Sequence, residues 1–209
     1  MERIARLIPL VKPFYTETSD PAHDWPHIGR VAASAKLLAK NQTLQLECLL
    51  AAVYCHDLVN LPKDHPERKN ASTLTANRAE TFLIEAGFND QEISLIKTSI
   101  IEHSFSKGLK PSSLESSILQ DADRLDALGA IGILRCASVN TQMKSHFYEP
   151  QDPLAKDREL DDRKYMIDHY FVKLFKLPET MNTEAGKKEA GSRVEYMKKF
   201  LDTLMGEVR

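Results

Sequence analysis

The sequence has little of what marks secreted, membrane-spanning or nucleic-acid-binding proteins. Its 209 residues include three cysteines, one tryptophan and 7% aromatic residues, and the formal net charge is -2. A charge so close to zero gives no general attraction to nucleic acid or to anionic membranes. No stretch approaches the roughly 18 consecutive apolar residues that a membrane-spanning helix requires. An anionic substrate would therefore have to be attracted by a local cluster of residues.

The cysteines do not predict a disulfide framework. Their number is odd, and Cys48 and Cys55 lie seven positions apart within one expected helix. At a rise of about 1.5 Å per residue their Cα atoms would be roughly 10 Å apart, which is beyond the reach of a disulfide. The N-terminal residues also lack the apolar run and the cleavage site of a secretory signal. We therefore expect a cytoplasmic protein with reduced thiols.

The hydrophobic pattern predicts an all-α protein. Apolar residues recur at intervals of three and four almost everywhere, and alternating runs long enough for strands are scarce. We interpret residues 1–209 as one domain, with a motif core at about 20–141 and C-terminal helices 162–206 that pack on it. Residues 144–162 are polar and contain prolines, so we expect a long loop there that is either mobile or a lid. The expected helices cover residues 2–15, 26–40, 44–58, 71–86, 90–103, 114–126, 127–141, 162–176 and 183–206.

Four residues on three of these helices suggest a metal site. His27, the adjacent pair His56 and Asp57, and Asp123 offer two imidazoles and two carboxylates. The pair closes the helix expected over residues 44–58, which is nearly apolar all round and should lie at the centre of the domain. An ionised carboxylate beside apolar helices costs several kcal/mol unless an opposite charge compensates it. A divalent cation supplies that charge and lowers the pKa of a bound water, which suits hydrolysis.

Motifs along the whole chain resemble the HD phosphohydrolases in content and order. They are HDWPHIGRV, VYCHDLVNLPKDHPER, EHSFSKG, QDADRLDALGAIGILR and the C-terminal FVKLFKLPETMNTEAGKKEAGSRVEYMKKFL. The resemblance is greatest to the bacterial branch whose members include nucleotide pyrophosphohydrolases that use manganese or a similar ion. It implies an all-α HD-domain bundle with the metal site at its centre, and it implies that His27, His56, Asp57 and Asp123 are the ligands.

One departure from the wider superfamily bears on the number of metals. Two-metal members usually place two further histidines between the His-Asp pair and the final aspartate. This chain has His103 at a suitable position, but the helix expected over 71–86 contains no histidine, and His65 lies too early. We therefore expect one divalent ion. Mn²⁺ is favoured by the resemblance, and these ligands also accept Mg²⁺, Fe²⁺, Co²⁺, Ni²⁺ or Zn²⁺.

Two further residues are candidates for proton transfer. His103 ends a helix just before a short polar loop, and imidazole titrates near neutral pH, so it can donate a proton to a leaving phosphate or contact the phosphoryl group. The alternative is a capping or core histidine. Asp126 follows Asp123 by three residues and can orient a ligand or accept a proton from the bound water. It can equally pair with an arginine.

Basic residues near these motifs are candidates for binding substrate phosphates. Arg124 adjoins Asp123, and Lys107 lies in the small-residue loop after His103. Arg30 follows His27 by about one helical turn, and His23 precedes it by four residues, so both are further candidates for substrate contact. Each of them can instead be a solvated or paired surface residue.

Three functions are compatible with this site. The first is a phosphohydrolase in which a metal-bound water attacks phosphorus, with a nucleoside or deoxynucleoside triphosphate, cleaved to release pyrophosphate, or a monophosphate as the expected substrate. The second is a sensor that binds metal and nucleotide without turnover, but degenerate modules tend to lose a ligand and none is missing here. The third is a di-iron oxygenase of the same scaffold, which needs two metals. We expect a small phosphorylated partner, and neither a nucleic acid nor a membrane.

Overall fold

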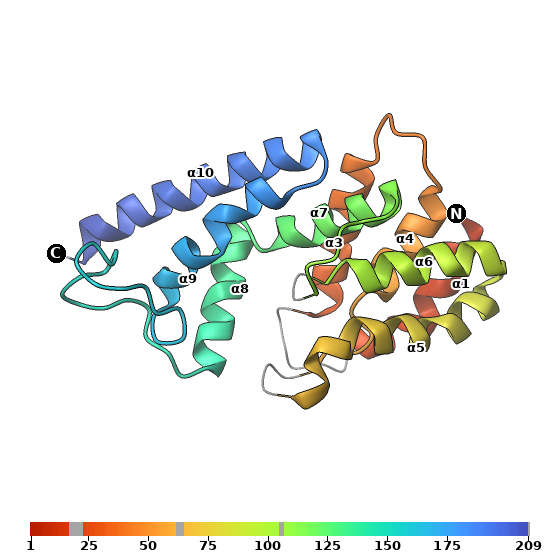
Figure 1. Ribbon diagram of the computed structural model, residues 1–209, viewed down its shortest axis with the longest axis horizontal. Helices are drawn as coiled ribbons and strands as arrows, with labels where there is room; N and C mark the ends of the chain where they lie inside the picture. Colours follow the sequence, from red (N-terminus) through yellow and green to blue (C-terminus); the bar gives the residue numbers. More distant parts are fainter. Residues whose placement is uncertain (17–22, 62–64, 105–106, 209) are drawn as a thin grey trace. The chain divides into compact units, whose positions relative to one another are not determined.

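The structure of the chain is a computed structural model that describes residues 1–16, 23–61, 65–104 and 107–208 (Figure 1). These residues form helices and contain no strand, and the isolated bridge between His146 and Tyr165 is their one β-type pairing. The predicted all-α class is therefore confirmed. None of the described helices is both long and apolar enough to cross a membrane. The chain forms two compact units, Met1–Asp123 and Arg124–Arg209.

The first unit is organised around a central apolar helix, α4. This helix packs against α1, α3, α5 and α6, and Leu49, Leu50 and Val53 on it are fully buried. Burial of each large apolar side chain contributes about 2 kcal/mol, so α4 anchors the unit. The elements of this unit are α1 (Glu2–Val11), α2 (Pro13–Thr16), α3 (Trp25–Leu38), α4 (Leu46–Cys55), η1 (Pro66–Asn70), α5 (Ala71–Ala86), α6 (Asp90–Glu102) and α7 (Leu114–Asp126), whose last residues enter the second unit.

Several helix ends are set by local signals that the sequence contains. Helix α5 matches its predicted bounds, and Gly87 ends it with a left-handed φ of 91°. Helix α6 begins with a reciprocal capping box between Asn89 and Glu92. Helix α7 also has the predicted bounds. Local chemistry therefore sets the end of α5 and the start of α6.

Two predicted helices of this unit are wrong in extent. The segment 2–15 divides into α1 and α2 because Pro13 interrupts the chain after Lys12, while Pro9 is accommodated inside α1. The segment 44–58 is helical only between Leu46 and Cys55. His56 therefore follows the last turn as its C-cap, where its ring nitrogen bonds back to the helix.

The second unit consists of α8 (Gly129–Gln142), α9 (Met166–Val172), η3 (Leu174–Thr180) and α10 (Glu184–Glu207), with α10 packed on α8 and η3. The helix predicted over 162–176 is shorter than expected. Lys173 leaves helical geometry with φ -130° and ψ -57°, and a 3₁₀ segment containing Pro178 follows. Helix α10 begins after the cap Thr183, whose side chain accepts a hydrogen bond from the Gly186 amide.

The long loop predicted over 144–162 is held by a buried carboxylate. Asp168, on α9, is fully buried and accepts hydrogen bonds from Arg158 Nη1 at 2.6 Å and Nη2 at 2.8 Å. It also accepts one from the Asp161 amide at 2.7 Å. This bidentate pair connects the loop to α9 inside the second unit. Movement of the loop as a lid stays a prediction.

Candidate metal centre

His27 enters the site from the first turn of α3. Asp24 caps this helix and accepts a hydrogen bond from the His27 amide at 2.9 Å, and Pro26 occupies the first turn, where its missing N–H costs nothing. The His27 side chain is fully buried. This cap therefore sets the position of the first imidazole.

His56 and Asp57 enter the site just beyond the C-terminus of α4. The His56 side chain is fully buried, and its Nδ1 donates to the Val53 carbonyl at 2.8 Å in the neutral tautomer that this contact selects. The Nε2 atom then points toward carboxylates, 3.5 Å from Asp57 Oδ2. A histidine that ligates a metal commonly gives its second ring N–H to a backbone carbonyl in this way.

Asp123, in the last turn of α7, completes the group. Its Oδ1 lies 3.7 Å from His27 Nε2 and 3.8 Å from His56 Nε2, and Asp57 Oδ2 lies 3.7 Å from His27 Nε2. The side chains of Asp57 and Asp123 are 20% and 30% exposed, so solvent reaches the carboxylates while both imidazoles are sealed. These separations exceed ordinary hydrogen-bond lengths but are short enough for one ion to be shared.

His103 lies beside this group and repeats the arrangement of His56. It is the C-cap of α6, and its Nδ1 bonds to the carbonyl of Ile100, three residues earlier. Its ring centroid is 5.0 Å from that of His56, and its Nε2 is 3.9 Å from Asp57 Oδ1. The structure thus places this candidate proton-transfer residue against the candidate ligands.

The electrostatics of the cluster favour added positive charge. Burial alone would lower the pKa of His56, but the Asp57 and Asp123 carboxylates raise it to about 9. Burial likewise opposes ionisation of Asp57 and Asp123, yet the neighbouring imidazoles hold both carboxyl pKa values well below their usual range. Burial and the charge of His56 lower the pKa of His103. The two carboxylates are therefore stable in the ionised form because a positive charge lies beside them.

The residues present fit a divalent cation. His56 Nε2 is buried and makes no hydrogen bond with the described part of the chain. When an ion displaces the Nε2 proton, the Val53 contact keeps the remaining proton on Nδ1, so Nε2 then offers a lone pair to the ion. His27, His56 and Asp57 offer ligand atoms within 4.8 Å of one another, and Asp123 Oδ1 lies within 4 Å of both imidazoles. An ion between them would replace the imidazolium proton as the positive charge that faces the two carboxylates.

The candidate substrate residues of the first unit are His23, Arg30 and Lys107. The ring of His23 is 6.0 Å from that of His27, in an edge-on arrangement. Arg30 lies on α3 one turn beyond His27 and is half-buried. Lys107 donates from Nζ to Thr73 Oγ1 on α5 at 2.6 Å. Their roles in substrate binding stay predictions.

The two candidates of the second unit have partners within that unit. Arg124 Nη1 donates to the carbonyl oxygen of Thr180. Asp126 is buried and accepts from Arg135 Nη1 at 2.6 Å, so the pairing with an arginine that the sequence allowed is present. The proposed catalytic role of Asp126 and the phosphate-binding role of Arg124 stay predictions.

Two polar residues near the site have no distinctive sequence signal. Gln120 is buried on α7 and donates from Nε2 to the carbonyls of Glu102 at 2.7 Å and Leu109 at 3.0 Å, so it connects the end of α6 to Leu109. The Tyr15 hydroxyl donates to the Tyr54 carbonyl at 2.9 Å. Burial raises the pKa of Tyr15, so its phenol stays a donor. In the sequence, a glutamine or tyrosine inside an apolar pattern predicts only a core residue.

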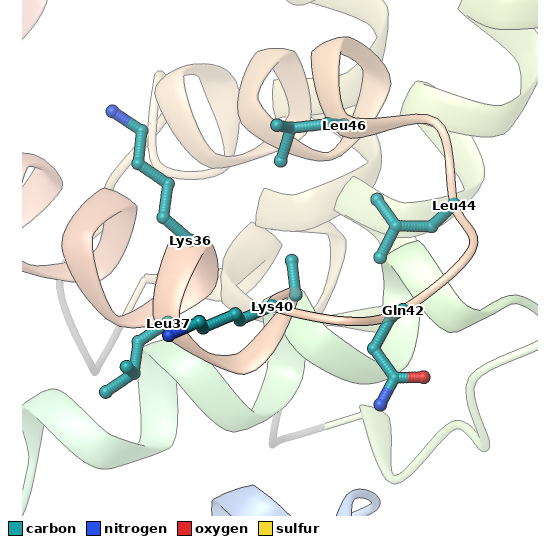
Figure 2. Close-up of a pocket in the computed structure, with 7 residues that line it drawn as sticks. Lys36, Leu37, Lys40, Gln42, Leu44 and Leu46 are labelled. Atoms are coloured by element: carbon teal, nitrogen blue, oxygen red, sulfur yellow. The ribbon is translucent and has the colours of Figure 1, made fainter.

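One described groove lies away from this chemistry. It has a volume of about 460 Å³ and lies where α3 ends and α4 begins, at the opposite end of α3 from His27 (Figure 2). Its lining consists of aliphatic, lysine and glutamine side chains and contains no histidine or carboxylate. The candidate metal centre is instead a tight group of buried side chains open at its carboxylates.

Comparison with known families identifies one match. Residues 25–128 match the HD domain family. The matched segment begins at Trp25, just before His27, and ends after Asp123, so it contains all four predicted ligands and His103.

Relatives and solved structures extend the likeness over nearly the whole chain. The chain is 28% identical over 186 residues to YpgQ of Bacillus subtilis, described as an uncharacterized protein, and this covers 89% of the chain and 84% of YpgQ. The crystal structure of B. subtilis YpgQ in complex with ADP superposes with a TM-score of 0.74 at 26% identity, covering 98% of this chain and 94% of that one. An HD-superfamily hydrolase from Bacillus thuringiensis gives a TM-score of 0.75 at 29% identity, covering 99% and 96%.

Proposed function

We propose that this chain, a member of the HD-domain family, is a metal-dependent phosphohydrolase that acts on nucleotides. The observation that carries the proposal is the group of two buried imidazoles and two carboxylates, whose nitrogen and oxygen atoms lie 3.5 to 3.8 Å apart. The HD-superfamily hydrolase of B. thuringiensis and the ADP complex of B. subtilis YpgQ support the hydrolase class and the nucleotide ligand.

His27, His56, Asp57 and Asp123 would hold the ion. A divalent cation held there would polarise a phosphoryl oxygen and lower the pKa of a coordinated water, which would make hydroxide available near neutral pH. The carbonyl of Val53 keeps the proton of His56 on Nδ1 and so leaves Nε2 ready to ligate. Mixed imidazole and carboxylate ligation accepts several metals, among which Mn²⁺ is our expectation.

His103 is suited to move a proton at this site. Its pKa is lowered by burial and by the charge of His56, so the neutral ring predominates near neutral pH. With the Nδ1 proton engaged by Ile100, the Nε2 lone pair can accept a proton from the attacking water and return it to the leaving oxygen. Asp57, 3.9 Å away, stabilises the protonated form between these two events.

Basic side chains neutralise the phosphate charge in this proposal. Lys107 is held by Thr73 close to the loop that begins at His103, and Arg124 follows Asp123 directly on α7. Both carry fixed positive charge at neutral pH and can contact the non-bridging oxygens of a polyphosphate. A nucleoside triphosphate would then be cleaved to release pyrophosphate, and a shorter nucleotide to release phosphate.

The deciding experiment is an assay of nucleoside mono-, di- and triphosphates with Mn²⁺, Mg²⁺, Co²⁺ and Ni²⁺, in which phosphate and pyrophosphate are measured separately. We expect steady turnover with at least one metal and none after chelation. Tight nucleotide binding without product over several hours would instead identify a sensor. Two irons per chain together with oxygen consumption would identify an oxygenase.

A further inference from the structure

The phenol of Tyr15 contacts the part of the chain that carries two candidate ligands. Tyr15 belongs to the short helix α2, is 2% exposed, and donates from its hydroxyl to the Tyr54 carbonyl at 2.9 Å. Tyr54 lies two residues before His56, in the last turn of α4. A contact from another helix therefore reaches the backbone just ahead of the His-Asp pair.

Together with two other contacts, this hydrogen bond gives three consecutive carbonyls at the end of α4 a donor. Carbonyls at a helix C-terminus lack intrahelical partners and normally face water. Here the Val53 carbonyl accepts from His56 Nδ1, the Tyr54 carbonyl from Tyr15, and the Cys55 carbonyl from the Leu58 amide at 3.3 Å. The direction in which His56 and Asp57 leave the helix is thus fixed by three consecutive hydrogen bonds.

The ring of Tyr15 also belongs to an aromatic group that joins the two segments bearing buried imidazoles. The rings of Trp25 and Tyr54 are stacked, with centroids 5.8 Å apart and an interplanar angle of 24°. The Tyr15 ring lies 6.1 Å from that of Trp25. Trp25 precedes His27 by two residues, as Tyr54 precedes His56, so this group aligns the start of α3 with the end of α4.

We propose that Tyr15 is a positioning residue for the metal centre, which holds the end of α4 so that His56 and Asp57 face the same ion as His27. The proposal rests on the metal-binding part of the proposed function and not on hydrolysis. Removal of an outer contact to a ligand typically weakens metal binding by about 10- to 100-fold. The hydroxyl here acts on backbone one step further from the ion, so the lower end of that range applies.

The test is Tyr15→Phe, which removes the hydroxyl and keeps the ring. We expect the dissociation constants for Mn²⁺ and Co²⁺, measured by calorimetry, to rise about tenfold. The visible absorption bands of the Co²⁺-loaded protein should also change, because they report the arrangement of ligands. The increase in melting temperature on adding metal should shrink, whereas a purely structural loss would lower the melting temperatures with and without metal equally.

A matched control is Tyr170→Phe in the second unit. Tyr170 is fully buried, and its hydroxyl makes no hydrogen bond with the residues that the structure describes. This variant should leave the Co²⁺ spectrum and the metal affinity unchanged. Wild-type affinity and spectrum in Tyr15→Phe would overturn the proposal, and so would loss of its fold, which would assign the hydroxyl to stability. If the wild-type protein binds metal but hydrolyses no nucleotide, only the proposed function fails.

Discussion

Carboxylates have different partners in the two units. In the second unit Asp168 pairs with Arg158 and Asp126 with Arg135, each with a contact of 2.6 Å. In the first unit Asp57 faces the imidazoles of His27 and His56 at 3.5 to 3.7 Å. Guanidinium and imidazole both offer positive charge to an oxygen, but the distances and the chemistry differ.

This difference separates a structural ion pair from a site that can exchange its cation. Arginine is always protonated and matches a carboxylate with two parallel hydrogen bonds, as Arg158 does on Asp168. An imidazole can release its proton and present a lone pair instead. The same carboxylate charge therefore stabilises the loop in one unit and leaves room for a metal in the other.

The largest expected effect is on the histidine cluster itself. His56→Ala or Asp57→Ala should abolish metal binding and activity together, by at least about 100-fold, because either change removes a proposed ligand. Metal content can be measured by mass spectrometry alongside the nucleotide assay. His169→Ala is the control, since His169 pairs with Asp162 in the second unit at 2.8 Å. Full activity of either ligand variant would sink the site assignment.

The reciprocal change is Asp168→Asn in the second unit. Removing one partner of a buried pair costs up to about 5 kcal/mol, and because Arg158 is 20% exposed we expect about 2 to 3 kcal/mol of lost unfolding free energy. Chemical denaturation measures this. Asp162→Asn, in a half-exposed pair, should cost less than about 0.5 kcal/mol. An unchanged denaturation midpoint for Asp168→Asn would contradict the structural role.

A smaller effect is expected for Arg124→Ala. It should lower kcat/KM by about 10- to 100-fold through lost contact with phosphate charge, with metal content unchanged. The exposed Arg163→Ala is its control and should be neutral. Loss of metal in Arg124→Ala would show that the arginine supports the site's structure and does not bind substrate.

Per pH unit, the smallest expected effect is a pH dependence of metal binding. The pKa of His56 is raised to about 9 in the metal-free protein, so a proton must leave when an ion binds. The Co²⁺ dissociation constant should therefore fall by about threefold to tenfold per unit between about pH 6 and about pH 8. The matching stability of the metal-free fold is present below the unfolded value of 6.5 and is lost as pH rises through about 9. Affinity independent of pH would show that His56 does not exchange its proton.

Much of the first unit could be predicted because its signals are local. The Asp24 cap, Gly87 and the 3.6-residue periodicity place α3 and α5. The residue types at His27, His56, Asp57 and Asp123 predict a metal site, and the structure brings their side chains together. The apolar periodicity continues past Cys55 and therefore predicted a helix over 44–58. The observed helix ends at Cys55, and the ring of the next residue, His56, bonds back to the backbone.

What escaped prediction depends on contacts between distant segments. Tyr15 and Tyr54 are 39 residues apart, and Gln120 lies 18 residues from Glu102, so no window of sequence joins them. The pairing of Arg158 with Asp168 could not be predicted either, because the sequence around Arg158 indicates only a polar loop. Such contacts form only when the helices pack together, so the roles of these tyrosine, glutamine and aspartate residues depend on the tertiary structure.

The histidines at the ends of α4 and α6 share one local arrangement, which is useful in protein design. Each residue sits at a helix C-cap with φ near -62°, and its Nδ1 takes the carbonyl three residues earlier. The helix carbonyl thereby presets which nitrogen keeps the proton, and Nε2 is left to face away from the helix. A designer could place a histidine at the end of an apolar helix to preset its tautomer, and add an outer donor such as Tyr15 to hold the helix end.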